Sequence, residues 1–294
     1  MNESKSKAGN SKRRTESTSE REAYSVSSRR RGFTLLELLV VIGILAVVVS
    51  ILLPALSSAR RSGMRAACGA RLRELGRALV MYANDHDDRA IPLAYTDMAV
   101  IGSGPAVYWW GTNESGAVDH ERGFTWPYLQ TIPSPSSVFE CPEQPWGSYR
   151  PQGAAQAITS TYGYNGYYLS PSQTPGFSFQ IGHREWKTLS RVREASQVFV
   201  FADAMIDLGG ALPRNSALLD PPMLFDGAGW TLNESPTTSF RHADRAQAVH
   251  ADGHVEAYRS RPAWLTSSRW RIGSVGVENG PHYVPDWRDW IAAP

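Results

Sequence analysis

The chain has 294 residues, 42% of them hydrophobic, which is long enough to bury a core in one or two domains. Its formal net charge is +2, but residues 1–32 hold nine Lys and Arg against four Glu, so the remainder is mildly acidic. A mildly acidic remainder gives no reason to expect a nucleic-acid partner.

A membrane span is the first predicted element. Residues 1–28 carry almost no apolar side chains, so they are expected to be disordered. Residues 33–56 then form a run of 24 residues with a single charge, Glu37. At a helical rise of about 1.5 Å per residue, this run can cross a hydrocarbon layer of about 30 Å. The sequence therefore predicts a transmembrane helix over residues 33–56.

An amphipathic helix is predicted to continue the span over residues 57–84. Arginines occupy some faces of this segment, and apolar residues recur on another at steps of three and four, namely Leu72, Leu75, Leu79 and Tyr82. Pro54 lies inside the pattern and lacks a backbone donor, so a kink or local melting is expected there. The predicted long helix covers residues 33–84.

Residues 85–294 are predicted to form a globular domain. This part of the sequence is rich in Gly, Pro and aromatic residues, and the short apolar runs at 197–202 and 248–258 indicate strands. Asp252-Gly253 predicts a two-residue hairpin turn of type I′, because Gly accepts a positive φ. The expected fold class is α+β, with a long kinked N-terminal helix packed on a C-terminal antiparallel β-sheet domain.

The start of the span carries the most specific motif. Basic residues before an apolar run also describe an ordinary secretory signal or an uncleaved anchor. However, the polar leader is long, and Glu37 places a charge inside the span. A charge in hydrocarbon costs free energy, so its presence indicates a functional role. The segment Arg30–Glu37, with six consecutive matching positions from Gly32, resembles the processing site of type IV prepilins and type II secretion pseudopilins.

This resemblance implies a processed, membrane-anchored subunit. A membrane aspartic protease, the prepilin peptidase, would cut between Gly32 and Phe33, remove the leader 1–32 and leave the Phe33 amine to be methylated. The carboxylate of Glu37 would pair with that amine of a neighbouring subunit during assembly, because the two charges neutralise each other in hydrocarbon. Pro54 matches a helix-breaking Pro found at a similar depth in many pilins.

The resemblance also implies a location and a set of partners. The chain would cross the inner membrane once, with the leader in the cytoplasm and the domain at 85–294 in the periplasm or outside the cell. Its partners would be the prepilin peptidase, other pseudopilin subunits, the inner-membrane secretion assembly platform and lipid. The competing hypothesis is a single-pass anchored protein whose periplasmic domain binds polysaccharide.

A second, looser resemblance covers the remainder. The helix segment 66–82, the pair Cys141-Pro142 and the segment 162–166 resemble the corresponding sequences of pseudopilin-like proteins of planctomycetes. Those proteins end with a His, nine residues and Asp-Gly, and here His242 precedes Asp252-Gly253 by that spacing.

Two sets of residues in the sequence are candidate metal ligands. His242, His250, Asp252 and His254 crowd together, but a turn at Asp252 breaks the register of a single strand, so a structural hairpin with a buried or turn-capping His242 is favoured. Some pseudopilins resembling this chain bind calcium near the C-terminus. The candidate oxygen ligands here are Asp203, Asp207, Asp226 and Asp252.

Sugar binding and catalysis are two further functions to consider from the sequence. Two aromatic groups, Tyr108-Trp109-Trp110 and Tyr164, Tyr167 and Tyr168, are interpreted as core packing rather than as a sugar-stacking platform. A phosphate-binding loop, a nucleophile elbow and a His-Glu-x-x-His motif are absent from the sequence, so an enzyme is not expected. No resident cofactor besides calcium is proposed at this stage.

The two cysteines, Cys68 and Cys141, both follow the span. Their spacing matches no zinc, redox or haem motif. On the oxidising side of the membrane they allow one disulfide, which would fasten the helix to the domain, and the alternative is two free thiols.

Overall fold

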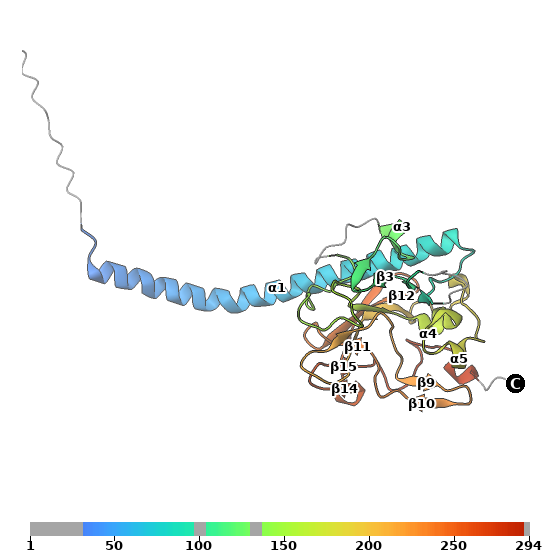
Figure 1. Ribbon diagram of the computed structural model, residues 1–294. Helices are drawn as coiled ribbons and strands as arrows, with labels where there is room; N and C mark the ends of the chain where they lie inside the picture. Colours follow the sequence, from blue (N-terminus) through green and yellow to red (C-terminus); the bar gives the residue numbers. More distant parts are fainter. Residues whose placement is uncertain (1–31, 97–103, 130–136, 291–294) are drawn as a thin grey trace, which may run out of the picture. The chain divides into compact units, whose positions relative to one another are not determined.

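The computed structural model describes residues 32–96, 104–129 and 137–290 (Figure 1). The predicted leader lies outside the described residues except for Gly32. The chain divides into a part that ends at Leu53 and a part that begins at Pro54, and each is described by itself. The second part contains all the strands.

Helix α1 spans Leu35–Asp85, within two residues of the prediction. It runs through Pro54 as continuous α-helix, so the expected local melting is wrong, while a kink there remains a prediction. A proline removes a single donor, and the helix-forming residues around it keep theirs. The helix ends where Asp87 and Asp88 adopt φ values of 52° and 62°, in the left-handed region.

The main sheet has four antiparallel strands in the order β13-β12-β6-β5. Their bounds are β5 Tyr162–Tyr164, β6 Phe199–Asp203, β12 Arg245–His250 and β13 Val255–Arg259. Both predicted apolar runs fall on these strands. The α+β fold class is therefore confirmed.

The hairpin between β12 and β13 is confirmed, but its turn differs from the prediction. The Gly253 N–H donates to the His250 carbonyl at 2.9 Å, and Gly253 has a φ of +89°. A type I′ turn needs positive φ at both central residues, and Asp252 does not have one. Only the glycine carries the left-handed conformation that closes this turn.

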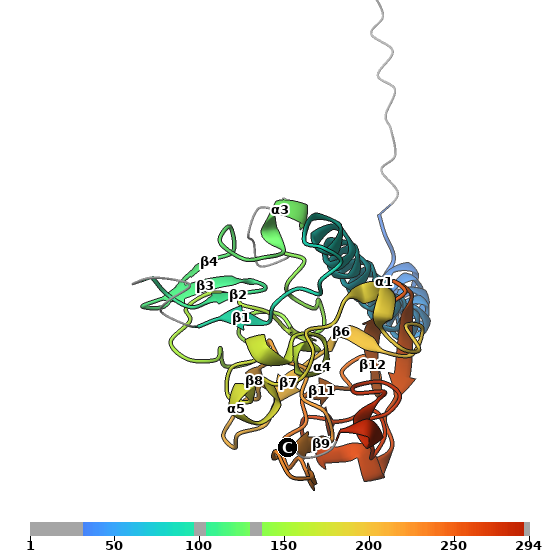
Figure 2. The same cartoon turned by 90° about the vertical axis from the view of Figure 1, so that its right-hand side faces the viewer.

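Smaller elements surround the main sheet (Figure 2). A second four-stranded sheet consists of β1 Ala94–Tyr95, β2 Val107–Tyr108, β3 Gly111–Glu114 and β4 Ala117–Asp119. The remaining short strands are β7 Met205–Ile206, β8 Arg214–Asn215, β9 Met223–Phe225, β10 Trp230–Leu232, β11 Thr238–Ser239, β14 Leu265–Ser267 and β15 Ile272–Gly273. Short helices lie at α3 Trp126–Leu129, α4 Gly166–Leu169 and α5 Ser178–Ile181, with 3₁₀ turns at Pro171–Gln173, Leu189–Arg191, Pro262–Trp264 and Trp287–Asp289.

The C-terminal half of α1 packs directly on the main sheet. Its buried face approaches β12 so closely that a Cβ added at Gly69 would lie 2.9 Å from Gln247 Oε1, and one at Gly76 would lie 2.8 Å from Val249 Cγ2. The Gln247 amide also donates to the Arg65 carbonyl at 2.9 Å. Two small residues seven positions apart therefore let the helix backbone reach the sheet.

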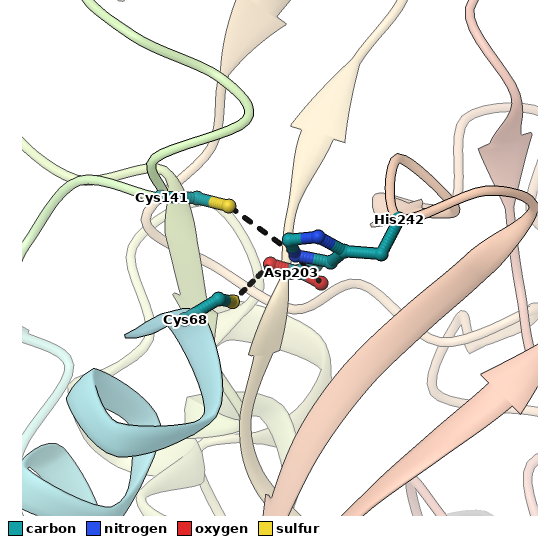
Figure 3. A group of neighbouring side chains, drawn as sticks. All are labelled: Cys68, Cys141, Asp203 and His242. Carbon is teal, nitrogen blue, oxygen red and sulfur yellow. Dashed lines mark hydrogen bonds and ion pairs between the residues drawn. The ribbon is translucent and has the colours of Figure 1, made fainter. Parts of the chain in front are cut away.

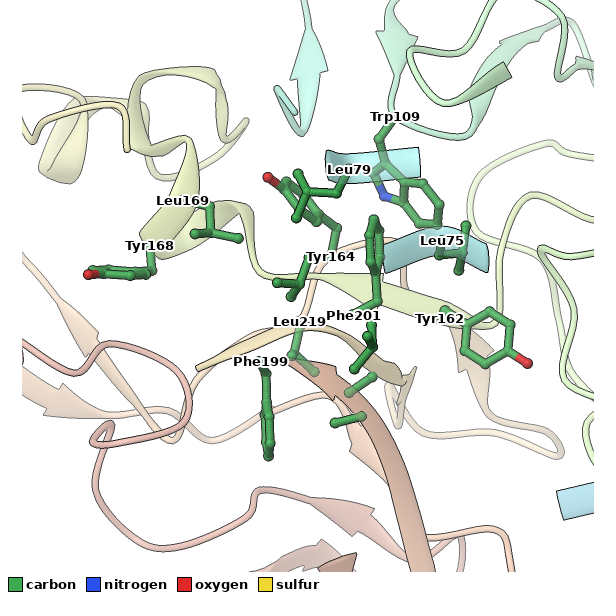
Figure 4. Close-up of a cluster of buried hydrophobic side chains, with 14 of the residues drawn as sticks. Leu75, Leu79, Trp109, Tyr162, Tyr164, Tyr168, Leu169, Phe199, Phe201 and Leu219 are labelled. Atoms are coloured by element: carbon green, nitrogen blue, oxygen red, sulfur yellow. The ribbon is translucent and has the colours of Figure 1, made fainter. Parts of the chain in front are cut away.

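Aromatic side chains fill the core between α1 and the sheet (Figure 4). The ring of Phe201 lies 4.9 Å from those of both Trp109 and Tyr164. Tyr167 and Tyr168 are also buried, whereas Tyr108 is partly exposed and stacks on Trp110. Core packing is confirmed for Trp109, Tyr164, Tyr167 and Tyr168, whereas Tyr108 and Trp110 also line a pocket.

Candidate functional site

The segment that carries the processing motif lies at the start of α1. Gly32 and Phe33 precede the first helical turn, and the Phe33 side chain is 74% exposed. The peptide bond between them is thus outside regular structure and is open to a protease in the described part of the chain.

Thr34 and Glu37 close the first turn of α1 as a capping box. The Thr34 hydroxyl accepts from the Glu37 N–H at 3.2 Å, and the Glu37 carboxylate accepts from the Thr34 N–H at 2.9 Å and from its hydroxyl at 2.8 Å. This arrangement satisfies backbone donors that have no partner at a helix start. Sequence reasoning missed it, although Thr-x-x-Glu before an apolar run is its usual signal.

The span presents an uncovered apolar surface. Every residue from Leu35 to Leu56 is exposed, and α1 is the one described helix that is long and apolar enough to cross a membrane. A monomer in water would expose this surface, so lipid or other helices must cover it.

A second site, a buried cluster of four side chains, joins segments far apart in the sequence (Figure 3). Cys68 comes from α1, Cys141 from the loop before β5, Asp203 from the end of β6 and His242 from the loop before β12. One ligand atom from each lies within 4.8 Å of all the others. All four residues are no more than 1% exposed.

Short contacts connect the members of this cluster. The Cys68 thiol donates to Asp203 Oδ1 at 3.4 Å, while Cys141 Sγ lies 3.3 Å from His242 Nε2. The same Nε2 is 3.3 Å from Asp203 Oδ2, and the other ring nitrogen of His242 is 3.0 Å from Glu143 Oε2. His242 thus turns one nitrogen toward the cluster and the other toward a carboxylate.

Charged neighbours perturb the ionisation of the cluster. Burial alone raises the pKa of Asp203, but Arg241, whose Nε is 3.6 Å from Oδ1, and His242 lower it below its usual value. Burial alone lowers the pKa of His242, but Asp203 and Cys141 raise it to about 10. Asp203 is therefore favoured as a carboxylate beside two positive partners.

The two thiols differ in the direction of their pKa shifts. Burial and the neighbouring Cys141 and Asp203 raise the pKa of Cys68. Burial also acts to raise the pKa of Cys141, but the neighbouring Cys68 and the cations Arg241 and His242 lower it. The surroundings thus favour the protonated form of Cys68, which donates to Asp203, and the thiolate form of Cys141.

Cys68 and Cys141 are both free thiols in this structure, and a disulfide between them stays a prediction. Their sulfurs lie close together, as the disulfide hypothesis required, but each has other partners. Cys68 donates to Asp203 and accepts from the Tyr162 hydroxyl at 3.4 Å, and Cys141 contacts His242.

The four candidate calcium ligands do not share any one of the metal-type side-chain groups among the described residues. Asp203 belongs to the buried cluster, whereas Asp207, Asp226 and Asp252 each accept backbone N–H bonds within their own loops. Among the described residues, the groups of His, Cys, Asp and Glu that could hold a metal include none of these three. Calcium binding by any of these aspartates therefore stays a prediction.

The histidines of the hairpin also differ from expectation. The turn separates His250 from His254 in sequence, but it places their rings face to face, with centroids 4.0 Å apart. Glu256 joins them in a partly exposed group. His242 is buried, as predicted, but it neither caps the hairpin turn nor lies beside these residues.

The side chains around Cys141 resemble a catalytic triad, but they are buried. Cys141, His242 and Glu143 lie in the order of a thiol nucleophile, a base and an orienting carboxylate. However, Cys141 and His242 are fully buried, so a substrate cannot reach the sulfur. In this state the arrangement can hold an ion or a proton.

Comparison with known proteins identifies the N-terminal segment. Residues 27–53 match the prokaryotic N-terminal methylation motif. This match supports a type IV pilin-like or pseudopilin-like chain that is a substrate of prepilin peptidase. No curated protein and no solved structure matches the chain. The resemblance of His242, Asp252 and Gly253 to a planctomycete group stays a prediction.

Proposed function

We propose that the chain is a structural subunit of a type II secretion pseudopilus or a related type IV pilus-like fibre. The observation that carries this proposal is the contiguous motif from Gly32 to Glu37, followed at once by an apolar helix that nothing described in the chain covers. The match of residues 27–53 to the methylation motif supports the same assignment.

The uncovered helix supplies the reason for polymerisation. In the membrane its apolar surface contacts lipid, and in a fibre it would contact the same helix of neighbouring subunits. Glu37 is costly in hydrocarbon, and the free amine of a processed Phe33 would offset its charge in an adjacent subunit. In the monomer Thr34 satisfies part of the hydrogen-bonding capacity of the carboxylate, but it supplies no positive charge.

This function carries a location and partners with it. The leader would lie in the cytoplasm and the domain in the periplasm or outside the cell, with the span in the inner membrane. Prepilin peptidase, other pseudopilin subunits and the assembly platform would act on the membrane part. The role is structural rather than enzymatic, which agrees with the inaccessibility of the buried thiols.

The first test is the N-terminus of the protein extracted from membranes. Mass spectrometry should find a chain that begins at Phe33 and carries a methyl group on its amine. Gly32→Val should block cleavage because a branched side chain crowds the protease site, whereas Gly63→Ala, on an exposed turn of α1, should leave it intact. Membrane protein that begins upstream of Arg31 in every case, with affinity of its domain for a glycan, would replace the proposal with an anchored binding protein.

The second test separates the charge of Glu37 from its role in the helix cap. Glu37→Leu removes both, Glu37→Gln keeps a capping acceptor without charge, and Thr34→Ala removes the cap but keeps the charge. All three should insert in the membrane. We expect both Glu37 variants to enter fibres poorly beside wild-type subunits, whereas Thr34→Ala enters them.

The readout of this second test is the share of tagged variant in fibres sheared from cells. Normal incorporation of Glu37→Gln together with failure of Thr34→Ala would assign the role of Glu37 to the cap, and the proposed charge pairing would be wrong.

A further inference from the structure

The buried cluster of Cys68, Cys141, Asp203 and His242 has the composition of a metal site. Two sulfurs, one imidazole nitrogen and one carboxylate oxygen converge within 4.8 Å of one another. Figure 3 shows the four side chains pointing toward one another from separate segments. We propose that these four residues bind a structural zinc ion.

The donor atoms select the class of metal. Calcium and magnesium take oxygen ligands, and this cluster offers one carboxylate. Thiolate and imidazole ligands favour zinc, which is bound by four protein ligands in tetrahedral structural sites. With four protein donors available and all four side chains buried, no ligand position is left for water or a substrate.

The orientation of His242 fits metal binding. Its Nε2 lies beside Cys141 and Asp203, and its Nδ1 is 3.0 Å from a Glu143 oxygen. A histidine that ligates a metal through one nitrogen usually donates its other N–H to a carboxylate or carbonyl, which fixes the ring and raises its basicity. Glu143 occupies that place.

The surrounding charges favour a cation at the centre of the cluster. Two thiolates with the Asp203 and Glu143 carboxylates carry four negative charges, and a zinc ion together with Arg241 carries three positive ones, so the ion would offset most of the negative charge. The Arg241 guanidinium is held by the carbonyls of Thr161 and Ala204 at 2.9 and 3.2 Å, and its Nε faces Asp203. Without a cation, Cys68 keeps its proton and donates it to Asp203, and a zinc ion would take the place of that proton.

The ligands show what the ion would do. Cys68 belongs to the helix that continues from the span, whereas the other three ligands belong to two loops and the end of a central strand. A zinc ion would therefore tie the membrane-proximal helix to three separate parts of the domain. This is the mechanical role that a disulfide between the cysteines was expected to play, and it does not depend on whether the chain forms fibres.

The test begins with the full-length protein purified from membranes in detergent, without chelator and without added metal. Thiols are trapped with an alkylating reagent in intact cells in a parallel sample, to record any disulfide. Metal analysis should find one zinc per chain. Replacement of zinc by cobalt should produce the thiolate-to-cobalt charge-transfer absorption and the intense visible bands that are typical of tetrahedral coordination.

Variants assign the ion to the cluster. Cys141→Ser should lose the zinc and the cobalt spectrum, whereas Asp252→Asn, at the exposed turn, should keep both. Glu143→Gln keeps all four ligands but removes the carboxylate charge beside His242 Nδ1, so its zinc affinity in competition with a chelator should fall by about 10- to 100-fold. This last variant keeps the proposal testable if Cys141→Ser does not fold.

Three results would overturn the proposal. The first is folded wild-type protein that binds neither zinc nor cobalt while both thiols are free. The second is a Cys68–Cys141 disulfide in the alkylated cell sample. The third is zinc that stays bound with unchanged affinity in both Cys141→Ser and Glu143→Gln, which would place it elsewhere in the chain.

Discussion

The contact between α1 and the main sheet can be tested with two glycines of the same helix. Gly76 is buried against β12, and an added Cβ would lie 2.8 Å from Val249 Cγ2 and 3.7 Å from its Cγ1. Gly63 is exposed, and nothing lies within 4 Å of the Cβ position. The substitutions Gly76→Ala and Gly63→Ala therefore make the same chemical change in two environments.

The expected magnitude follows from two opposing effects. Alanine is favoured over glycine inside a helix by about 1 kcal/mol, and both variants gain this. Only Gly76→Ala forces a methyl group into a stiff, buried valine, and overpacking of a core costs about 1–3 kcal/mol. Gly63→Ala should thus raise the free energy of unfolding by about 1 kcal/mol, and Gly76→Ala should leave it unchanged or lower it by up to about 2 kcal/mol.

The measurement is thermal and urea unfolding of the detergent-solubilised protein, followed by tryptophan fluorescence. A difference of about 2 kcal/mol between the variants corresponds to roughly 4–8 °C in Tm for a domain of this size. The propensity effect cancels in this difference, so it reports the packing alone. If Gly76→Ala proves as stable as Gly63→Ala, the close packing of α1 on β12 is refuted.

Two further predictions concern protons and metal. Burial and the neighbouring His254 and His282 lower the pKa of His250 to about 4, while Glu256 acts to raise it and Tyr258 holds its Nε2 at 2.9 Å. The unfolded chain therefore takes up this proton first, and stability that is present above about pH 6.5 should be lost as the pH falls toward 4. His250→Gln should flatten this part of the stability curve by about 2 kcal/mol after allowance for solvent screening, and parallel curves for the two proteins would contradict the assignment. Removal of zinc by a strong chelator should lower the free energy of unfolding by about 4 kcal/mol when the ion had been present at about 1,000 times its Kd, and an unchanged urea midpoint would show that the ion is not structural.

Local patterns in the sequence were sufficient for α1, β6 and the β12–β13 hairpin, but not for β5 or the smaller strands and helices. The apolar run and the spacing of Leu72, Leu75 and Leu79 located α1 to within two residues, because helix formation depends on neighbours a turn away. Alternating apolar residues and Asp252-Gly253 located the hairpin for the same reason. The type of turn was predicted wrongly, because it depends on the φ of Asp252, which the sequence does not determine.

The buried cluster depends on distances that no local pattern contains. Its ligands are separated by more than a hundred residues in some pairs, such as Cys141 and His242, and they meet only because β6 and β12 pair and α1 packs on both. Asp203 was considered as a calcium ligand because its partners were unknown. The presence of two cysteines and a buried histidine was visible in the sequence, but their convergence was not.

The tight packing and the metal ligand lie on the same stretch of α1. Cys68, Gly69 and Gly76 all face the domain within little more than two turns of helix, and Gln247 on the opposing strand also binds the Arg65 carbonyl. In the proposed fibre, neighbouring subunits hold the apolar half of the helix, so any pull on that half reaches the domain through this stretch. A close backbone contact resists sliding, and a four-ligand ion resists separation. With the close contact and the ion on the same stretch of α1, the domain would stay attached to its helix during assembly. The domain would not need contacts of its own with the apolar surface that polymerises.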